Sequence, residues 1–582
     1  MPTRLSFRRL AVSVLALGVV SAGAITPHPS AAGPEAGINA GAYMAARQAS
    51  IHNDFQAAAM YFSRALARDP KNPAILEFAT SSYLGLGDVA RATTIARQMV
   101  QIGLENQIAN LVIIGEAAKG GDWGDILNDL ESGQTVGPLF DGLLKAWALV
   151  GDAQHDAAMA QFDTVASSPG VRAFGLYHKA LALASRGDYA GADAILSDPA
   201  DGGIPLSRRG IVAHVQILSQ LDRQAEALAL LQDAFGANVD RALEELIARL
   251  TRGERLPFDV TPTAVDGVAE VYFSIANALR GEASANYTLL YARMASHLRP
   301  GHIDASLLTA GILDNLDLHD LAIEVYATIP ETDSAWDAAE LGRARALRRG
   351  GDVDGAIGVL RDLTRARPDL ALLEVTLGDF LREEQRYAEA IPAYDAAIEL
   401  FEEDEQGQWI VYFARAIALE RLDRWPEAEA DFRKALELNP DEPQVLNYLG
   451  YSYVEKEGNL DEALDMIRRA AAARPQSGAI ADSLGWVYYR LGRYEEAVAP
   501  MERAVELMPV DAVVNDHLGD VYWAVGRELE ARFQWKRALS FVKADDPDND
   551  VDPDRIRRKL EVGLDRVLEE EGEDPLKVAS DG

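Results

Sequence analysis

The sequence predicts an all-α protein built as a solenoid of about twelve helix pairs. Alanine, leucine, glutamate, aspartate and arginine dominate its 582 residues, and this composition favours helices over sheets. Small residues recur with a 34-residue period, as Gly485 and Gly519 illustrate. Each period contains two helical stretches of about a dozen residues around a turn such as Gly492-Arg493. Small residues suit closely crossing helices, because only Gly or Ala lets two backbones approach.

The N-terminus has the layout of a secretory signal peptide. Three arginines precede an apolar run: Arg4, Arg8 and Arg9 stand before Leu10–Val20. This run is shorter than the roughly 20 residues that cross a bilayer, which favours a cleaved leader over a retained anchor. Cleavage would follow Ala24 or Ala32. We therefore expect residues 1–32 to be signal peptide and flexible leader, and the mature protein to be periplasmic.

Charge and cysteine content exclude several kinds of partner and site. The formal net charge is −35, so the chain repels polyanions and nucleic acid is not an expected partner. The acidity suits a solvated surface or a basic partner. The absence of cysteine excludes disulfides, thiolate metal sites, cysteine nucleophiles and a lipidated cysteine after the leader.

The array divides into two parts at a segment without helical periodicity. We expect an N-terminal array over residues 39–250, degenerate after about residue 108, and a C-terminal array over residues 268–540. Between them, residues 251–267 read as a linker or bend because of three helix-breaking residues: Gly253, Pro257 and Pro262. Upstream of Gly485 the small-residue position recurs at Gly450, Ala416, Gly378, Ala344, Ala310 and Ala276.

After the repeats, an acidic linker is expected over residues 541–554, a capping helix over 555–571 and a tail over 572–582. The linker alternates carboxylates that could bind calcium: Asp546, Asp548, Asp550, Asp552 and Asp554. No glycine stands at the sharp-turn position, and Arg557 replaces the glutamate that would close such a loop. A solvated linker is therefore the favoured interpretation.

Two stretches carry a family resemblance, LGWVYYRLGRYEEAVAPMERAVELMP from Leu484 and LGDVYWAVGRELEARFQWKRAL from Leu518. They resemble the tetratricopeptide repeat family, and the similarity covers about 500 residues. The resemblance implies a right-handed superhelix of helix pairs. Its concave groove, lined by the first helix of each pair, would accept an extended or helical peptide, as in an interaction scaffold.

The resemblance also implies which residues line this peptide-binding groove: Asn447, Tyr451, Asp482, Trp486, Tyr489, Arg490, Asp516, Asp520 and Trp523. Trp, Tyr and Arg beside carboxylates are typical of binding hot spots. Family members that bind chaperones use Lys and Asn there to hold a terminal carboxylate, whereas this chain has aspartates. We therefore expect a ligand segment with Lys or Arg. The alternative is that the aromatic residues only pack between neighbouring repeats.

No motif indicates catalysis, a cofactor or a metal. The chain lacks the phosphate-binding, nucleophile-elbow and zinc-helix motifs, and its closest useful histidines, His297 and His302, are not spaced as ligands on one helix face. A leader followed by degenerate repeats and a better-formed C-terminal block resembles envelope adaptors of Gram-negative bacteria, some of which activate a carboxyl-terminal processing protease. The alternatives are a structural scaffold in envelope or outer-membrane assembly, and an enzyme with a hidden site in residues 108–267.

Overall fold

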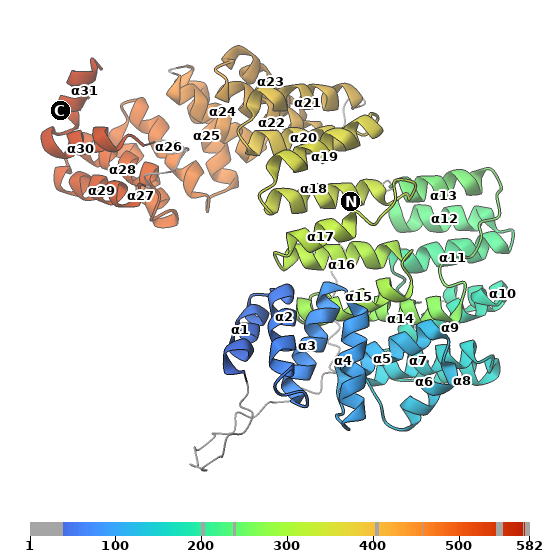
Figure 1. The fold of residues 1–582 in the computed structure, drawn as a ribbon. Helices are drawn as coiled ribbons and strands as arrows, with labels where there is room; N and C mark the ends of the chain where they lie inside the picture. Colours follow the sequence, from blue (N-terminus) through green and yellow to red (C-terminus); the bar gives the residue numbers. More distant parts are fainter. Residues whose placement is uncertain are drawn as a thin grey trace, which may run out of the picture. The chain divides into compact units, whose positions relative to one another are not determined.

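The computed structural model describes residues 39–198, 204–236, 240–401, 407–456, 458–542, 551–573 and 576. The leader expected over residues 1–32, the aspartates of the acidic linker before Val551 and most of the C-terminal tail lie outside this part of the chain. The described residues are α-helical apart from turns, short connections and one isolated bridge between Arg280 and Ala283. The predicted all-α class is therefore confirmed (Figure 1).

The helices fall into two compact units, divided between Val359 and Leu360. The N-terminal unit contains α1 (Ala40–Ile51), α2 (Phe55–Leu66), α3 (Pro73–Leu86), α4 (Val89–Gln101), α5 (Gln107–Gly120), α6 (Trp123–Glu131), α7 (Pro138–Gly151), α8 (His155–Ala166), α9 (Arg172–Ser185), α10 (Tyr189–Leu196), α11 (Arg208–Gln220), α12 (Gln224–Phe235), α13 (Arg241–Thr251), α14 (Ala264–Leu279), α15 (Ala285–Leu298), α16 (Ile303–Asn315), α17 (His319–Tyr326) and α18 (Trp336–Arg349). Helix α19 (Val353–Ala366) spans the division.

The C-terminal unit continues with helices of similar length. They are α20 (Ala371–Glu383), α21 (Tyr387–Leu400), α22 (Gln408–Arg421), α23 (Trp425–Leu438), α24 (Pro443–Glu455), α25 (Leu460–Ala473), α26 (Gly478–Arg490), α27 (Tyr494–Leu507), α28 (Ala512–Ala524), α29 (Glu528–Phe541), α30 (Pro553–Val562) and α31 (Leu564–Glu571). The capping helix expected over 555–571 is thus two helices, because the chain turns at Gly563 with a φ of 86°.

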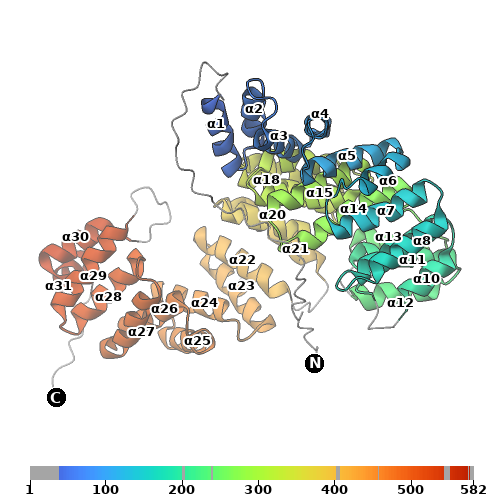
Figure 2. The ribbon, with the colours of Figure 1, turned by 90° about the horizontal axis from the view of Figure 1, so that it is seen from below.

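Consecutive helices pack as antiparallel pairs, six among α1–α12, two among α14–α17 and five among α20–α29, close to the predicted number (Figures 1 and 2). The predicted small-residue positions lie where the two helices of a pair cross. A Cβ atom on Gly485 would stand 2.5 Å from Met501, and one on Gly519 would stand 2.4 Å from Trp535. Close approach of the backbones therefore produces the 34-residue period.

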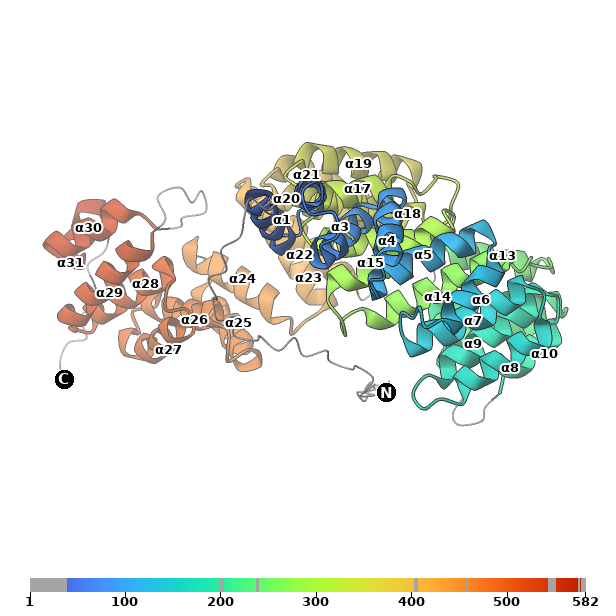
Figure 3. The ribbon, with the colours of Figure 1, turned by 60° about the horizontal axis from the view of Figure 1, so that its bottom comes forward.

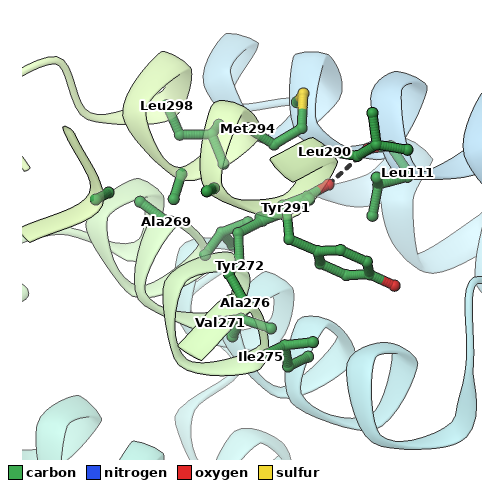
Figure 4. Close-up of a cluster of buried hydrophobic side chains, with 14 of the residues drawn as sticks. Leu111, Ala269, Val271, Tyr272, Ile275, Ala276, Leu290, Tyr291, Met294 and Leu298 are labelled. Atoms are coloured by element: carbon green, nitrogen blue, oxygen red, sulfur yellow. Dashed lines mark hydrogen bonds between the residues drawn. The ribbon is translucent and has the colours of Figure 1, made fainter. Parts of the chain in front are cut away.

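Helices α14 and α15 cover the first helices of the preceding pairs. They pack against α3, α5, α7 and α9 (Figure 3). One hydrophobic core in this unit includes residues from Phe55 to Ala346. The hydroxyl of buried Tyr272 donates to the backbone oxygen of Leu111 at 2.6 Å (Figure 4). Within the segment 251–267, predicted to be a linker or bend, residues 252–263 are non-helical, and residues 251 and 264–267 belong to α13 and α14. Helices α14 and α15, which follow this segment, pack on helices that precede it.

A buried ionic cluster holds α14 to its neighbours. The carboxylate of Glu270 accepts from Arg209 of α11 at 2.6 Å and from the hydroxyl of Tyr177 of α9 at 3.0 Å. Arg209 also donates to Asp304 of α16 at 2.9 Å and to the backbone oxygen of Val260 at 3.1 Å. Burial would raise the pKa of Glu270, but the charge of Arg209 outweighs it and holds that pKa well below its usual range.

Candidate peptide-binding face

In the C-terminal unit the first helices of the pairs are α20, α22, α24, α26 and α28. The residues that these helices leave partly exposed recur at the same repeat positions from one helix to the next. We call the side of these helices that carries the nine predicted residues and their repeat equivalents the first-helix face. On α20 and α22 the repeat equivalents of the nine residues are Val375, Asp379, Arg382, Glu383, Phe413, Ile417, Glu420 and Arg421. Leu372 and Ile410 stand three residues before Val375 and Phe413, on the same side of these helices. The face therefore runs through consecutive repeats of the same unit.

At its N-terminal end this face is apolar. The side chain of Leu372 is 67% exposed and that of Ile410 is 50% exposed, although both are large and aliphatic. Beside them Phe413 and Ile417 are partly buried against the core of the unit. Solvent-exposed aliphatic residues at equivalent positions of successive repeats form an apolar strip that folding of the unit leaves uncovered.

Acidic residues lie in the last turn of the first helices, at the opposite end from Leu372 and Ile410. Glu383 and Glu455 are exposed, and Glu420 lies half-buried between them in the repeat order. On the next helix the indole Nε1 of Trp486 donates to Glu455 at 2.8 Å. Cations of the chain lie beside two of these carboxylates: Glu420 is 3.8 Å from Nζ of Lys456 and 3.9 Å from Nε of Arg421, and Glu383 is 4.0 Å from Arg382. A ligand lying on this face would meet aliphatic side chains at one end of the helices and these paired carboxylates at the other.

The predicted residues of α26 contact α28 and one another. Asp482 is buried and pairs with Nδ1 of His517 at 3.0 Å. The imidazole stacks on Trp486 with ring centroids 3.9 Å apart, and Trp486 stacks on Tyr489 at 4.8 Å. Burial would lower the pKa of His517, but the charge of Asp482 and its hydrogen bond outweigh burial and raise it.

The predicted residues of α28 are covered by the C-terminal helices. Lys559 of α30 has no exposed side-chain surface, and its Nζ lies 2.8 Å from Asp516 and 2.7 Å from Asp520. Nε1 of Trp523 donates to Asp565 of α31 at 2.9 Å. Burial and the neighbouring Asp520 raise the pKa of Asp516, while Lys559 opposes this shift.

The expectation of an open acidic groove thus needs a correction. The carboxylates of Asp482, Asp516 and Asp520 are paired with cations of the same chain, because buried charges are stable only when paired. Of the remaining predicted residues, Asn447 has a side-chain oxygen without a hydrogen-bond partner, whereas Tyr451 and Arg490 make contacts within the chain. That these residues bind a peptide stays a prediction.

Sequence reasoning missed the residues that complete this face. Leu372 and Ile410 occupy the same repeat position as Gln444, one turn before the predicted residues, and none of the nine predicted residues stands at that position. Lys559 stands between Ile556 and Leu560 in the apolar pattern of its helix, and a lysine on the buried side of a helix indicates a buried carboxylate partner.

The described residues form neither a metal-binding cluster nor a membrane-spanning helix. No group of three or more His, Cys, Asp or Glu side chains there is arranged to hold a metal ion. In the same part of the chain, no helix combines the length and apolar character needed to cross a bilayer. The described residues of 108–267, where a hidden site was considered, form repeat-like helices and their connections.

These features define the class of the C-terminal unit as a helical repeat array with a partly apolar, partly acidic first-helix face. Models described as the tetratricopeptide repeat match residues 369–441, 413–478 and 455–512. Residues 369–512 are therefore tetratricopeptide repeats, as the quoted stretches predicted. Proteins with this fold generally act as protein-binding scaffolds, and the fold is typically non-catalytic.

A TPR repeat-containing protein of Pseudomonas aeruginosa is 28% identical over 174 residues, which are 30% of this chain and 28% of that relative. The chain therefore spans less than a third of the relative's length in this match. Yeast Tom70 is 13% identical and matches 87% of this chain and 92% of its own, with a TM-score of 0.33. YrrB, titled a TPR protein with an unusual peptide-binding site, is 19% identical over 31% of this chain and 91% of its own, with a TM-score of 0.27.

Proposed function

We propose that this chain is a non-catalytic adaptor of the bacterial cell envelope that binds a polypeptide segment on the first-helix face of α20–α26. The observation that carries the proposal is the exposure of Leu372 and Ile410 at equivalent repeat positions, on helices whose last turns carry Glu383 and Glu420. A ligand segment with aliphatic residues and with Lys or Arg would match both ends of this face. Delivery of such segments to a periplasmic protease is the specific role we assign to the adaptor.

The first helices of the N-terminal unit are partly covered, which supports the choice of the C-terminal unit as the one that binds the ligand. Helices α14 and α15 lie against α3, α5, α7 and α9, so a ligand could reach the covered side of these four helices only by displacing them. The proposed envelope location rests on the signal-peptide pattern before Val20. A structural scaffold of envelope assembly would bind through surfaces other than the α20–α26 face.

The test is affinity capture from envelope extract with the mature chain and with the double variant Leu372→Ser, Ile410→Ser. Each substitution removes about 1 kcal/mol of apolar contact with the ligand, so together they should reduce capture by more than tenfold. The matched control is Leu529→Ser with Phe533→Ser, because these two residues are 68% and 60% exposed on α29, a second helix.

Three outcomes distinguish the adaptor from the structural scaffold and from binding on another face. A protease lost with the Leu372, Ile410 variant and retained with the α29 control would support the adaptor role. Assembly proteins retained by both variants would favour the structural scaffold. Recovery of every partner by the Leu372, Ile410 variant at wild-type levels would rule out binding on this face.

A further inference from the structure

A cavity in the N-terminal unit lies between α9, α14 and the connection that precedes α11. Its volume is about 280 Å³. Helix α9 lines it with Phe174 and Tyr177, α14 lines it with Phe273 and Ser274, and the connection adds Leu206. Aromatic and aliphatic side chains therefore dominate its wall. A small cavity with apolar walls and few polar groups is the usual form of a small-molecule site.

The carboxylate in the lining of the cavity is already paired with a cation. Glu270 is buried, and Nε of Arg209 lies 2.6 Å from one of its oxygens. The other oxygen accepts from the hydroxyl of buried Tyr177 at 3.0 Å. A charged ligand would lose its hydration here without gaining an opposite charge that is free to pair with it. The cavity therefore favours a neutral ligand.

Ser274 belongs to a chain of hydrogen bonds with a fixed direction. The indole Nε1 of Trp147 donates to Nδ1 of His178 at 3.1 Å, so the neutral imidazole carries its proton on Nε2. This Nε2 donates to Oγ of Ser274 at 3.1 Å, and the Ser274 hydroxyl donates to the backbone oxygen of Val271 at 3.2 Å. Burial lowers the pKa of His178 to about 4, which keeps the imidazole neutral at physiological pH.

The direction of these bonds makes Ser274 an acceptor and not a nucleophile. A serine nucleophile needs an unprotonated histidine nitrogen to remove its proton, whereas the nitrogen that faces Ser274 is protonated. A hydroxyl oxygen has two lone pairs, of which His178 uses one. Ser274 is partly exposed in the cavity, so its second lone pair can accept from a ligand. The arrangement suits binding without chemical change of the ligand.

We propose that this cavity binds a neutral, mainly apolar small molecule of about two fused rings, which donates a hydroxyl or N–H group to Ser274. The size follows from the volume, because an apolar cavity of about 150 Å³ holds benzene and this one is nearly twice as large. The site lies in the N-terminal unit, away from the residues proposed to bind a polypeptide. It is a binding activity additional to the proposed function.

The ligand would join α14 to one of the helices that it covers. Its contacts come from both α9 and α14, so it binds only while these two helices are packed together. A ligand that binds only the packed state stabilises that state by mass action. At about ten times its dissociation constant, it should slow the hydrogen exchange that depends on opening of α14 by about tenfold.

The test measures the binding of naphthol to the full chain through the fluorescence of the ligand. We expect a dissociation constant below about 100 μM. Methoxynaphthalene has the same rings but no donor, so it should bind about tenfold more weakly. In the variant Ser274→Ala the two compounds should bind equally, because the acceptor has been removed.

Substitutions that fill the cavity show where the ligand binds. Ala173→Phe on α9 and Ala278→Phe on α14 each add a phenyl group to the lining and should weaken naphthol binding at least about tenfold. The matched control is Ala160→Phe, because Ala160 is exposed on α8, and this variant should bind naphthol as the wild type does. Hydrogen exchange of α9 and α14 without ligand verifies that each variant is folded.

Three results would overturn the proposal. Naphthol binding that neither filling variant reduces would place the ligand elsewhere. Equal binding of naphthol and methoxynaphthalene to the wild-type chain would show that no acceptor in the cavity contacts the ligand. Unchanged exchange of α9 and α14 at saturating naphthol would show that the ligand does not join these helices. If Ser274→Ala loses protection in α14, the wild-type comparison and the filling variants still decide the question.

Discussion

Replacing Glu270 by alanine should weaken the N-terminal unit by about 3 kcal/mol. The side chain of Glu270 is 1% exposed and that of Arg209 is 14% exposed, so the substitution leaves a largely buried guanidinium without its main partner. Breaking a buried pair in this way typically costs about 3–5 kcal/mol. The lower end applies because Arg209 keeps its bonds to Asp304 and to the backbone oxygen of Val260.

The assay is hydrogen exchange with peptide resolution on the full chain, because a single unfolding free energy is not defined for a chain of two units. Amides of α9, α11, α14 and α16 should exchange about a hundredfold faster in Glu270→Ala, while those of α20–α29 stay unchanged. Asp304→Ala is the control. Asp304 is 41% exposed, so its loss should cost no more than about 1 kcal/mol. Acceleration below about tenfold for Glu270→Ala, or an equal effect of both variants, would refute the reasoning.

The effect also has a pH dependence of fixed sign. The pKa of Glu270 is depressed in the folded protein, so its stabilisation is present above the pKa of an unfolded glutamate. It is lost as the pH falls through the folded value. The difference in exchange between wild type and Glu270→Ala should therefore persist at neutral pH and shrink only in acid.

Two further predictions concern glycines within helices and the pairing of His517 with Asp482. Gly378→Ala should destabilise its helix pair by about 1–3 kcal/mol, because the added Cβ would meet the buried ring of Tyr394 at 2.6 Å. Gly311→Ala, with nothing within 4 Å of the added Cβ, should stabilise its pair by about 0.5–1 kcal/mol. Hydrogen exchange of α20–α21 in the first variant and of α16–α17 in the second checks the opposite signs. His517→Gln should cost most at low pH. Because the pKa of His517 is raised in the folded protein, the stabilisation from its pairing with Asp482 is fully present below the unfolded pKa of about 6.5 and is lost as the pH rises through the folded pKa. Hydrogen exchange of α26 and α28 should therefore show that the extra protection of the wild type over His517→Gln decreases as the pH rises. A difference in protection that stays constant with pH would contradict this account.

The repeat architecture was predictable because its signal is local. A glycine such as Gly485 and the side chain that it accommodates lie on the two helices of one pair, and the same requirement recurs in the next pair. The covering of the N-terminal unit was not predictable in this way. Tyr272 and Leu111 are 161 residues apart, and no periodicity in the sequence relates them.

The candidate site was predictable in its positions and not in its partners. The repeat register places Asp482 and Asp516 at equivalent turns of first helices and Asp520 one turn further along α28. It could not supply the cation that each carboxylate receives, because His517 comes from the following repeat and Lys559 from beyond the acidic linker. The break at Gly563 was missed since the apolar pattern continues across it.

The packing of α14 and α15 on α3, α5, α7 and α9 makes the N-terminal unit unfold differently from the C-terminal unit. In the C-terminal unit each pair touches only its neighbours, so it should lose order progressively, repeat by repeat, from an end. In the N-terminal unit, contacts that close loops of well over a hundred residues must form before the early pairs are fully covered, which slows assembly and ties its helices into one all-or-none block. The C-terminal unit should therefore unfold gradually, and the N-terminal unit cooperatively.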